Sequence, residues 1–356
     1  MDSSRRDFLK LGTGAAAGAL LTASQGAAQA QAVNVAAAAS AAVVPKGSMA
    51  SLRLVTFAPD AAAAARVGAV TAAGRVVDLA AAAKARGTAL PFDAASMVSL
   101  IAAGPSALEQ VRKLVAEASP EEGPAVTAVR LLAPIPTPAR NVYAVGWNYL
   151  EHFEEGRAMR LNKADLPEHP VFFTKGVHTV NGPYDPIPFD PEVSTSIDWE
   201  GELAVVIGRR GRNIPEAEAM QYVFGYAVIN DTTARDIQQK KHGGQWFKGK
   251  SLDGHGPIGP WIVPAADLDY DNLHLVTRVN GVVKQDANTR QMYFKVPRII
   301  AELSLGLTLE PGDIIATGTP PGVGGARTPP EFLKPGDVME TEIAEIGTLR
   351  NVIQRV

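Results

Sequence analysis

Apolar residues along this 356-residue chain fall in short runs that glycine and proline interrupt, a pattern typical of strands rather than long helices. The segment 51–57 alternates between polar and apolar positions, and two β-branched runs, 66–70 and 75–79, are spaced as a hairpin. Two helical stretches are expected near 94–103 and 105–118. Residues 51–133 are therefore expected to form a small α+β unit. We interpret it as a cap or packing domain because no reactive constellation falls inside it.

A proline-punctuated boundary, Leu132–Pro138, separates this unit from the remainder of the chain. Residues 134–356 contain many short strand-like runs with frequent glycine and proline turns. Helices are expected over 216–223 and over 296–305, where Pro297 would fall in the first turn. The pattern predicts an α+β, β-rich protein whose second domain is a sheet-dominated roll or sandwich.

The first fifty residues have a different composition. Arg5 and Arg6 precede a short Gly/Ala-rich apolar stretch, and Ala28-Gln29-Ala30 is a small-x-small cleavage site. We interpret residues 1–30 as a twin-arginine export signal and 31–50 as an alanine-rich linker, which predicts a periplasmic protein. The alternative is a disordered N-terminus with a chance arginine pair.

Composition excludes several classes of function. The chain has no cysteine, which excludes disulfides, thiolate catalysis and cysteine-ligated metals. The formal net charge is −3 and no basic patch occurs, so nucleic-acid binding is not indicated. No apolar run predicts a membrane span, and no glycine-rich stretch matches a phosphate-binding pattern.

Three carboxylates are the strongest chemical signal. Glu200 and Glu202 begin an apolar β-branched run, so on a strand they project from the same face. Asp231 ends a second strand-like run, 223–229. If the two strands are neighbours, three oxygen ligands converge. Sites made only of carboxylates suit Mg²⁺, Mn²⁺ or Ca²⁺ rather than Zn²⁺.

A histidine and a glutamate supply a candidate base. His152 and Glu155 are three residues apart after a predicted strand, 141–145, so on a helix they share a face. A glutamate that accepts the proton of an imidazole N–H holds the ring in one tautomer and raises its basicity. Taken alone, this spacing more often marks a surface helix pair.

Two loops add further candidates. Lys250 lies in a glycine-rich turn downstream of Asp231, where it can bind a carboxylate or a developing enolate. Arg235 and Asp236 are expected to form a structural salt bridge. The run 313–324 predicts a strand that enters a Thr-Gly-Thr turn, whose N–H groups and hydroxyl can hold a carboxylate or an oxyanion.

Taken together and in this order, these segments resemble the fumarylacetoacetate hydrolase family. The resemblance covers roughly residues 136–356, and five motifs in register make it specific. The motifs are Val145-Gly146-x-Asn148-Tyr149 with His152-x-x-Glu155, Asp198-x-Glu200-x-Glu202-Leu203, Asn230-Asp231 with Ala234-Arg235-Asp236-Ile237-Gln238, Gly249-Lys250-Ser251, and Thr317-Gly318-Thr319-Pro320-x-Gly322-Val323-Gly324. Two departures, Trp147 and His178, fall where they can line a pocket.

The resemblance implies a mixed β-sandwich roll, a homodimer and one divalent metal, usually Mg²⁺. Each candidate residue takes a role by its match to a family motif. The metal ligands are Glu200, Glu202 and Asp231, the catalytic residues are His152, Glu155 and Lys250, and the substrate contacts are Gln238, Thr319 and Tyr149.

The expected activity is metal-dependent hydrolysis of a C–C bond in a 2-oxo acid or acylpyruvate-like substrate, through an enolate. The His–Glu pair favours hydrolysis because it can activate water. A decarboxylase or a keto–enol isomerase of 2-oxo diacids, similar to 2-hydroxyhepta-2,4-diene-1,7-dioate isomerase, is the close alternative. A non-catalytic exported binding protein is the third.

Overall fold

The computed structural model describes residues 51–60, 62–156 and 165–356, which all belong to one compact unit. The predicted export signal (1–30) and linker (31–50) lie outside the described residues, so export remains a prediction. In the described ranges, no helix has the length and apolar character needed to cross a membrane.

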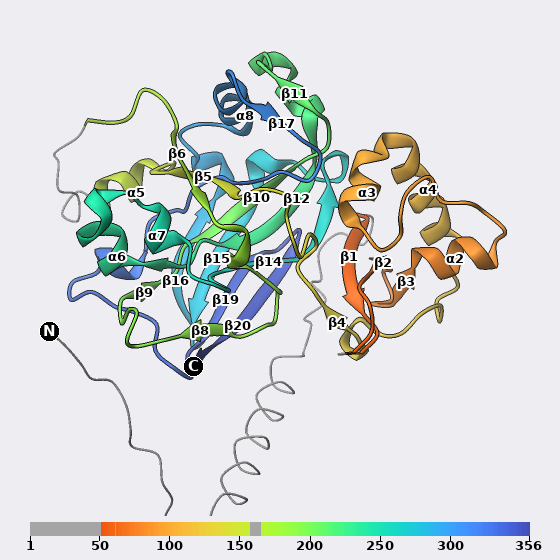
Figure 1. Cartoon of the computed structure of the whole chain (residues 1–356), viewed down its shortest axis with the longest axis horizontal. Helices are drawn as coiled ribbons and strands as arrows, with labels where there is room; N and C mark the ends of the chain where they lie inside the picture. The colour runs from red at the N-terminus through yellow and green to blue at the C-terminus, as the bar shows by residue number, and fades with distance from the viewer. Residues whose placement is uncertain (1–50, 61, 157–164) are drawn as a thin grey trace, which may run out of the picture. The chain divides into compact units, whose positions relative to one another are not determined.

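Two β-sheets dominate this unit (Figure 1). The larger, an 11-stranded sheet, has the strand order β3-β2-β1-β14-β12-β10-β18-β5-β6, with β4 paired to β1 and β7 to β14. Its strands are β1 Arg53–Ala58, β2 Arg66–Val70, β3 Val76–Asp78, β4 Arg130–Leu131, β5 Val142–Gly146, β6 Val171–Lys175, β7 Val180–Asn181, β10 Gly201–Ile207, β12 Val223–Asn230, β14 Gly256–Pro264 and β18 Ile314–Ala316. The predicted β-rich α+β class is confirmed.

The second sheet has five strands in the order β16-β15-β19-β20-β8. Its strands are β8 Ile187–Phe189, β15 His274–Val279, β16 Val282–Asn288, β19 Val338–Ile343 and β20 Gly347–Arg355. Two strand pairs complete the set: β9 Ile197–Asp198 with β13 Thr233–Ala234, and β11 Gly211–Arg212 with β17 Thr308–Leu309.

The first three strands extend the large sheet rather than forming a sheet of their own. Leu54 on β1 pairs with Ile262 on β14, far away in sequence. The Thr56 hydroxyl also donates to the Pro134 carbonyl at 2.6 Å. The segment 51–133 is thus joined to the following residues by backbone pairing, which a local sequence pattern does not reveal.

The helices follow local capping and packing signals. The α-helices are α2 Leu79–Ala85, α3 Met97–Ala102, α4 Gly104–Ala116, α5 Leu150–Glu155, α6 Arg235–Lys240, α7 Phe247–Lys250 and α8 Val296–Ser304. The predicted helices α3, α4 and α8 are confirmed, α8 with proline in its first turn. The expected helix at 216–223 is a 3₁₀ helix over Glu216–Tyr222. Helix α2 was not predicted, although Asp78 caps its N-terminus.

Shorter 3₁₀ turns punctuate the loops. They are Val126–Ala128, Val177–Thr179, His242–Gly244, Ala265–Asp267, Tyr270–Asn272, Thr289–Gln291 and Gly324–Ala326.

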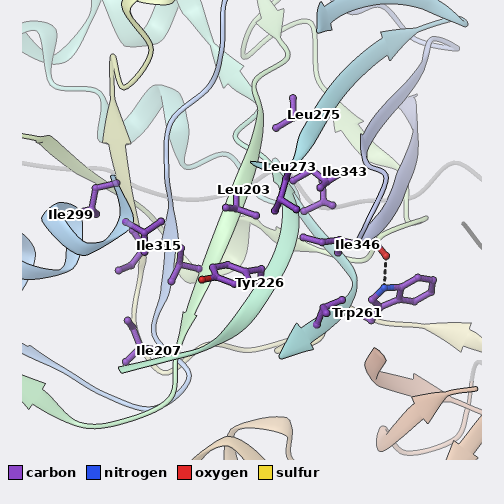
Figure 2. Close-up of a cluster of buried hydrophobic side chains, with 14 of the residues drawn as sticks. Leu203, Ile207, Tyr226, Trp261, Leu273, Leu275, Ile299, Ile315, Ile343 and Ile346 are labelled. Carbon is purple, nitrogen blue, oxygen red and sulfur yellow. Dashed lines mark hydrogen bonds between the residues drawn. The ribbon is translucent and has the colours of Figure 1, made fainter. Parts of the chain in front are cut away.

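Strand β10 is buried on both faces and is the rigid support of the carboxylates that precede and begin it. Leu203, Val205 and Ile207 point into one hydrophobic cluster, part of which Figure 2 shows. Ala204 and Val206 point into another. This alternation follows from the two-residue period of a strand. Because apolar contacts fix both faces, the start of β10 has little freedom to move.

We expect Leu203→Ala to lower the free energy of unfolding by about 2–5 kcal/mol, because it leaves a cavity at a side chain that is 0% exposed. Urea unfolding followed by circular dichroism measures the change. The matched control is Leu305→Ala, at a side chain that is 64% exposed, where the change should stay within about 0.5 kcal/mol. Equal losses in both variants would contradict this account of the core.

Candidate active site

The three predicted metal ligands converge at one end of β10 and β12. These strands pair antiparallel, with Gly201 opposite Asn230, and the Asp231 N–H donates to the Glu200 carbonyl at 2.8 Å. Glu200, Glu202 and Asp231 are buried, and one oxygen of each lies within 4.8 Å of the others. The expectation that the two strands are neighbours is confirmed.

Three buried cations surround these carboxylates. Lys250 Nζ lies 2.6 Å from Glu200 Oε2 and 2.7 Å from Asp231 Oδ2. Lys175 Nζ, at the end of β6, lies 2.7 Å from Asp231 Oδ1. Arg235 Nη2 lies 2.7 Å from Glu200 Oε1. The cations hold the Glu200 and Asp231 carboxylates in defined orientations.

The proposed metal ligands differ in how readily their carboxyl groups ionise. Burial raises the pKa of Glu202 well above its usual range, and the nearby carboxylates of Asp231 and Glu200 raise it further. Burial also opposes ionisation of Glu200, but Lys250 and Arg235 outweigh it and hold the Glu200 pKa below its usual range.

This donor set fits a divalent cation. The ligands are three buried carboxylates with no nitrogen or sulfur, which suits a hard oxygen-preferring ion. A nearby divalent charge favours the ionised form of Glu202, which the protein alone disfavours. Glu200, Glu202 and Asp231 are the residues that would hold the ion.

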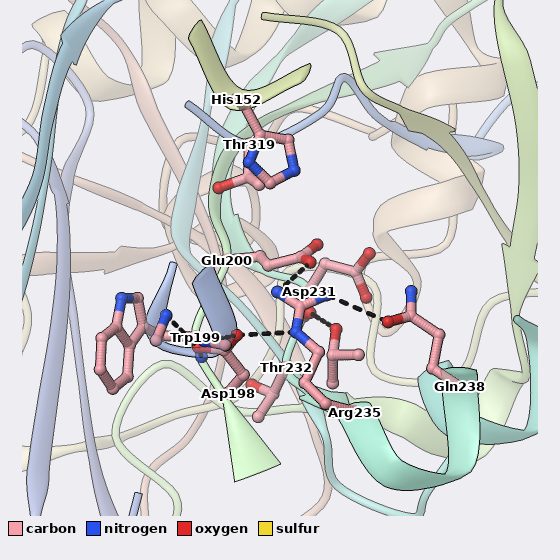
Figure 3. Close-up of polar contacts among 12 residues, drawn as sticks. His152, Asp198, Trp199, Glu200, Asp231, Thr232, Arg235, Gln238 and Thr319 are labelled. Carbon is pink, nitrogen blue, oxygen red and sulfur yellow. Dashed lines mark hydrogen bonds and ion pairs between the residues drawn. The ribbon is translucent and has the colours of Figure 1, made fainter. Parts of the chain in front are cut away.

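The His152–Glu155 pair has the geometry of an oriented base. His152 Nδ1 lies 2.8 Å from Glu155 Oε1 on helix α5. Both carboxylate oxygens of Glu155 also accept from the Gly322 N–H, at 3.0 and 2.8 Å. An ionised carboxylate only accepts, so Nδ1 of His152 would donate this hydrogen bond, and a neutral imidazole held in this way keeps the lone pair of Nε2. In the view of Figure 3, the His152 ring lies on one side of the Glu200 carboxylate.

Arg235 organises the site rather than pairing with Asp236, so that prediction was wrong. Its Nε lies 2.7 Å from Asp198 Oδ2, in addition to its contact with Glu200. Asp236 instead accepts from the Ser194 hydroxyl at 2.6 Å. Adjacent residues on helix α6 point in different directions, which is why the two do not meet.

Gln238 presents its amide N–H groups. Arg235 Nη1 donates to Gln238 Oε1 at 3.1 Å, as the dashed line in Figure 3 shows. An arginine can only donate, so the amide oxygen of Gln238 accepts this bond, and its amide nitrogen has no hydrogen-bond partner among the described residues. Gly249 on α7 packs closely against Gln238, and a Cβ at position 249 would lie 2.6 Å from the Gln238 backbone nitrogen.

Thr319 and Tyr149 were predicted to contact substrate, and both roles remain predictions. The Thr319 hydroxyl donates to the Gly201 carbonyl at 3.0 Å and accepts from Gln285 at 2.7 Å. Tyr149 is fully buried, and its hydroxyl has no hydrogen-bond partner among the described residues. Burial and the charge of Glu202 raise the pKa of Tyr149.

The Thr-Gly-Thr turn holds one of the protein's own carboxylates. The Gly318 N–H donates to Glu202 Oε2 at 2.7 Å. The sequence predicted that N–H groups of this turn bind a carboxylate or an oxyanion, and this backbone contact now orients a proposed metal ligand.

Aromatic side chains pack beside the lysine. Lys250 Nζ lies 5.0 Å from the centre of the Phe173 ring. Trp246 packs edge-on against Phe173 at 5.3 Å and against Trp147 at 4.9 Å. His178, the other departure from the family pattern, is exposed.

Sequence reasoning missed Lys175, whose side chain is entirely buried against Asp231. The available signal was a lysine that ends the apolar run Val171–Thr174, since a charge at the end of a buried strand needs a partner.

Comparison with known proteins assigns the family. The model of the fumarylacetoacetate (FAA) hydrolase C-terminal domain matches residues 141–354. The chain belongs to this family. Residues 51–140 lie outside the match.

A sequence relative of known name is a tautomerase. A Bacillus subtilis oxaloacetate tautomerase is 47% identical over 230 residues, which cover 64% of this chain and 74% of that protein. The chain is an enzyme of this family, and this relative favours the isomerase alternative. It does not specifically support the expected hydrolysis of a C–C bond.

Solved structures share the fold. A fumarylacetoacetate hydrolase from Exiguobacterium antarcticum has a TM-score of 0.70 and 37% identity, covering 86% of this chain and 100% of its own. A probable 2-hydroxyhepta-2,4-diene-1,7-dioate isomerase from Mycobacterium abscessus has 0.69 and 31%, covering 86% and 99%. A maleylpyruvate hydrolase from Sphingobium sp. SYK-6, in complex with manganese(II) ion and pyruvate, has 0.66 and 29%, covering 85% and 99%.

We expect Glu202→Gln to weaken Mn²⁺ binding by about tenfold or more, because it removes a charged ligand from the cluster. Titration calorimetry measures the affinity. In the wild type, protons compete for a carboxylate whose pKa is raised, so Mn²⁺ affinity should fall as the pH becomes acidic. The variant should lose that part of the pH dependence.

Glu121→Gln is the matched control, since the Glu121 side chain is 86% exposed. Unchanged Mn²⁺ affinity in Glu202→Gln would show that the ion binds elsewhere.

Proposed function

We propose that this protein is a divalent-metal-dependent keto–enol tautomerase of 2-oxo diacids, with oxaloacetate as the first substrate to test. The observation that carries the proposal is the oriented His152–Glu155 pair next to the buried carboxylate cluster. The tautomerase relative supports the same reading. Mg²⁺ is the proposed cofactor, with Mn²⁺ and Ca²⁺ as alternatives, because all three proposed ligands are oxygen donors.

A divalent cation at Glu200, Glu202 and Asp231 supplies Lewis-acid chemistry, which favours the enolate form of a 2-oxo acid. His152 acts on the proton. Its Nε2 takes a proton from the carbon next to the 2-oxo group, and a proton returned to the oxygen completes the enol. Glu155 holds the Nδ1–H throughout, so the ring stays in the tautomer that can accept at Nε2. The net change moves one proton from carbon to oxygen.

Two further side chains bind the negative charge of the substrate. An ammonium group has three N–H donors, and Lys250 directs two toward Glu200 and Asp231. The third is available to a substrate oxygen. The amide nitrogen of Gln238 supplies another donor, since its oxygen is held by Arg235. Donors placed before the substrate arrives favour an enolate over the neutral ketone.

Hydrolysis of a C–C bond is the second candidate. A base oriented like His152 can also activate water, and one structural neighbour is a maleylpyruvate hydrolase. Product analysis separates the candidates: an enol–ketone mixture of one acid indicates a tautomerase, two smaller products indicate a hydrolase, and CO₂ release indicates a decarboxylase.

We expect His152→Ala to slow oxaloacetate tautomerisation by about 10²-fold or more while Mn²⁺ affinity stays close to that of the wild type. The loss of enol absorbance in the ultraviolet measures the rate. His274→Ala is the matched control, since His274 also pairs with a carboxylate, Asp286 at 2.7 Å, but on the surface. Near-normal turnover in His152→Ala would exclude His152 as the base.

We also propose twin-arginine export to the periplasm, from the signal-like pattern of residues 1–30, and a homodimer, which the family resemblance implies. Replacing Arg5 and Arg6 by lysine should retain the protein in the cytoplasm, because the paired arginines are the recognised feature of the signal. Cell fractionation and immunoblotting measure the distribution. Undiminished periplasmic protein in this variant would contradict the export route.

A further inference from the structure

We propose that Trp199 is a positioning residue that fixes the His152–Glu155 pair relative to the metal ligands, through the backbone of Gly322. This inference deepens the tautomerase proposal and rests on it, because the rate measured below is the rate of oxaloacetate tautomerisation. Trp199 is not proposed to touch the substrate. It orients the His152–Glu155 pair through hydrogen bonds.

Trp199 is held firmly in place. It lies between Asp198 and Glu200 and is 0% exposed. The Lys284 ammonium lies 5.6 Å from the centre of the Trp199 ring, and the Arg327 guanidinium lies 5.8 Å away. Cations near an aromatic face restrict the orientation of the ring. The indole Nε1–H then donates to the Gly322 carbonyl at 3.0 Å.

Gly322 connects Trp199 to the His152–Glu155 pair by hydrogen bonds. Its carbonyl accepts from Trp199, and its N–H donates to both carboxylate oxygens of Glu155. Its φ is +104°, and a Cβ at this position would lie 2.1 Å from the Lys284 carbonyl oxygen. Only glycine fits this position. The relay therefore runs from the Trp199 indole through Gly322 and Glu155 to His152 Nδ1.

The neighbouring residue holds the same loop. Asp198 Oδ1 accepts from the Gly324 N–H at 2.7 Å, and Asp198 Oδ2 accepts from the Gly325 N–H at 2.8 Å. Two consecutive residues, Asp198 and Trp199, thus bind the loop that orients Glu155. The next residue is Glu200, a proposed metal ligand. One short segment therefore sets the distance between the base and the metal ligands, and misplacement of about 1 Å can cost a rate factor of about 10².

The alternative is that Trp199 only fills the hydrophobic core. Trp261 is the matched residue for testing this alternative. Trp261 is also 0% exposed, its Nε1 donates to the Ile346 carbonyl at 2.5 Å, and the Arg53 guanidinium lies 5.2 Å from its ring centre. Figure 2 shows the Trp261 hydrogen bond within the hydrophobic cluster. The two tryptophans match in burial, hydrogen bonding and a nearby cation, but only Trp199 leads to Glu155.

The experiment compares Trp199→Phe with Trp261→Phe in the Mn²⁺-loaded full-length protein. We expect Trp199→Phe to lower kcat for oxaloacetate tautomerisation by about 10–100-fold, while KM and Mn²⁺ affinity change by less than about threefold. Trp261→Phe should leave kcat within about threefold of the wild type. Equal kcat effects in the two variants, or a loss in Trp199→Phe that appears only in Mn²⁺ affinity, would overturn the proposal.

A spectroscopic readout does not depend on turnover. In protein labelled with nitrogen-15 histidine, the His152 signals should show Nδ1 protonated in the wild type and a mixture of tautomers in Trp199→Phe. An unchanged spectrum overturns the proposal. If the wild type does not tautomerise oxaloacetate, the functional proposal fails, and this spectrum still decides whether Trp199 positions the pair.

A second substitution separates the N–H from the shape of the ring. Benzothienylalanine incorporated at position 199 keeps the bicyclic ring but replaces the N–H by sulfur. It should reproduce the kcat loss and the tautomer mixture even if Trp199→Phe does not fold. Wild-type kcat and a wild-type spectrum in this protein would show that the Nε1–H to Gly322 contact has no positioning role.

Discussion

The compensation of buried charge is the constraint on which this site depends. Four carboxylates and three cations are gathered where β9, β10, β12 and β6 end, nearly all of them excluded from water. Isolated charges in such a place are strongly unfavourable, so each must find a partner. The members of the network are Asp198, Glu200, Glu202, Asp231, Lys175, Lys250 and Arg235. Glu202 is the exception that matters, because its partner is only a backbone N–H and its pKa is raised.

The same network also orients the residues that we propose for metal and substrate binding. The Arg235 guanidinium contacts Asp198, Glu200 and Gln238. It therefore orients a proposed metal ligand, Glu200, and a residue proposed to donate to the substrate, Gln238. The Gly322–Gly325 loop orients the proposed base in a similar way, since Asp198 and Trp199 bind the loop and Gly322 binds Glu155. A change at any of these contacts is expected to affect several of the proposed catalytic groups at once, because hydrogen-bonded groups respond cooperatively.

Sequence reasoning succeeded where the interaction is local. The two-residue period placed Glu200 and Glu202 together, the three-residue spacing placed His152 beside Glu155, and the proline in α8 marked its first turn. It failed at Arg235, where the adjacent Asp236 was a plausible partner but helix geometry directed the guanidinium to Asp198. It also failed at Lys175, whose partner Asp231 lies 56 positions away along the chain.

The amino-acid sequence by itself determined the β-rich class, the family motifs, the clustered carboxylates and the His–Glu pair that we propose as the base, because these depend on residue type and short-range spacing. Tertiary structure alone decided which charges pair, that β1 joins the sheet of β14, and that an indole links the metal-ligand segment to Glu155. The physical reason is that burial and pairing are properties of groups brought together from distant positions. Local periodicity shows which face a side chain occupies, but not which group it will meet there.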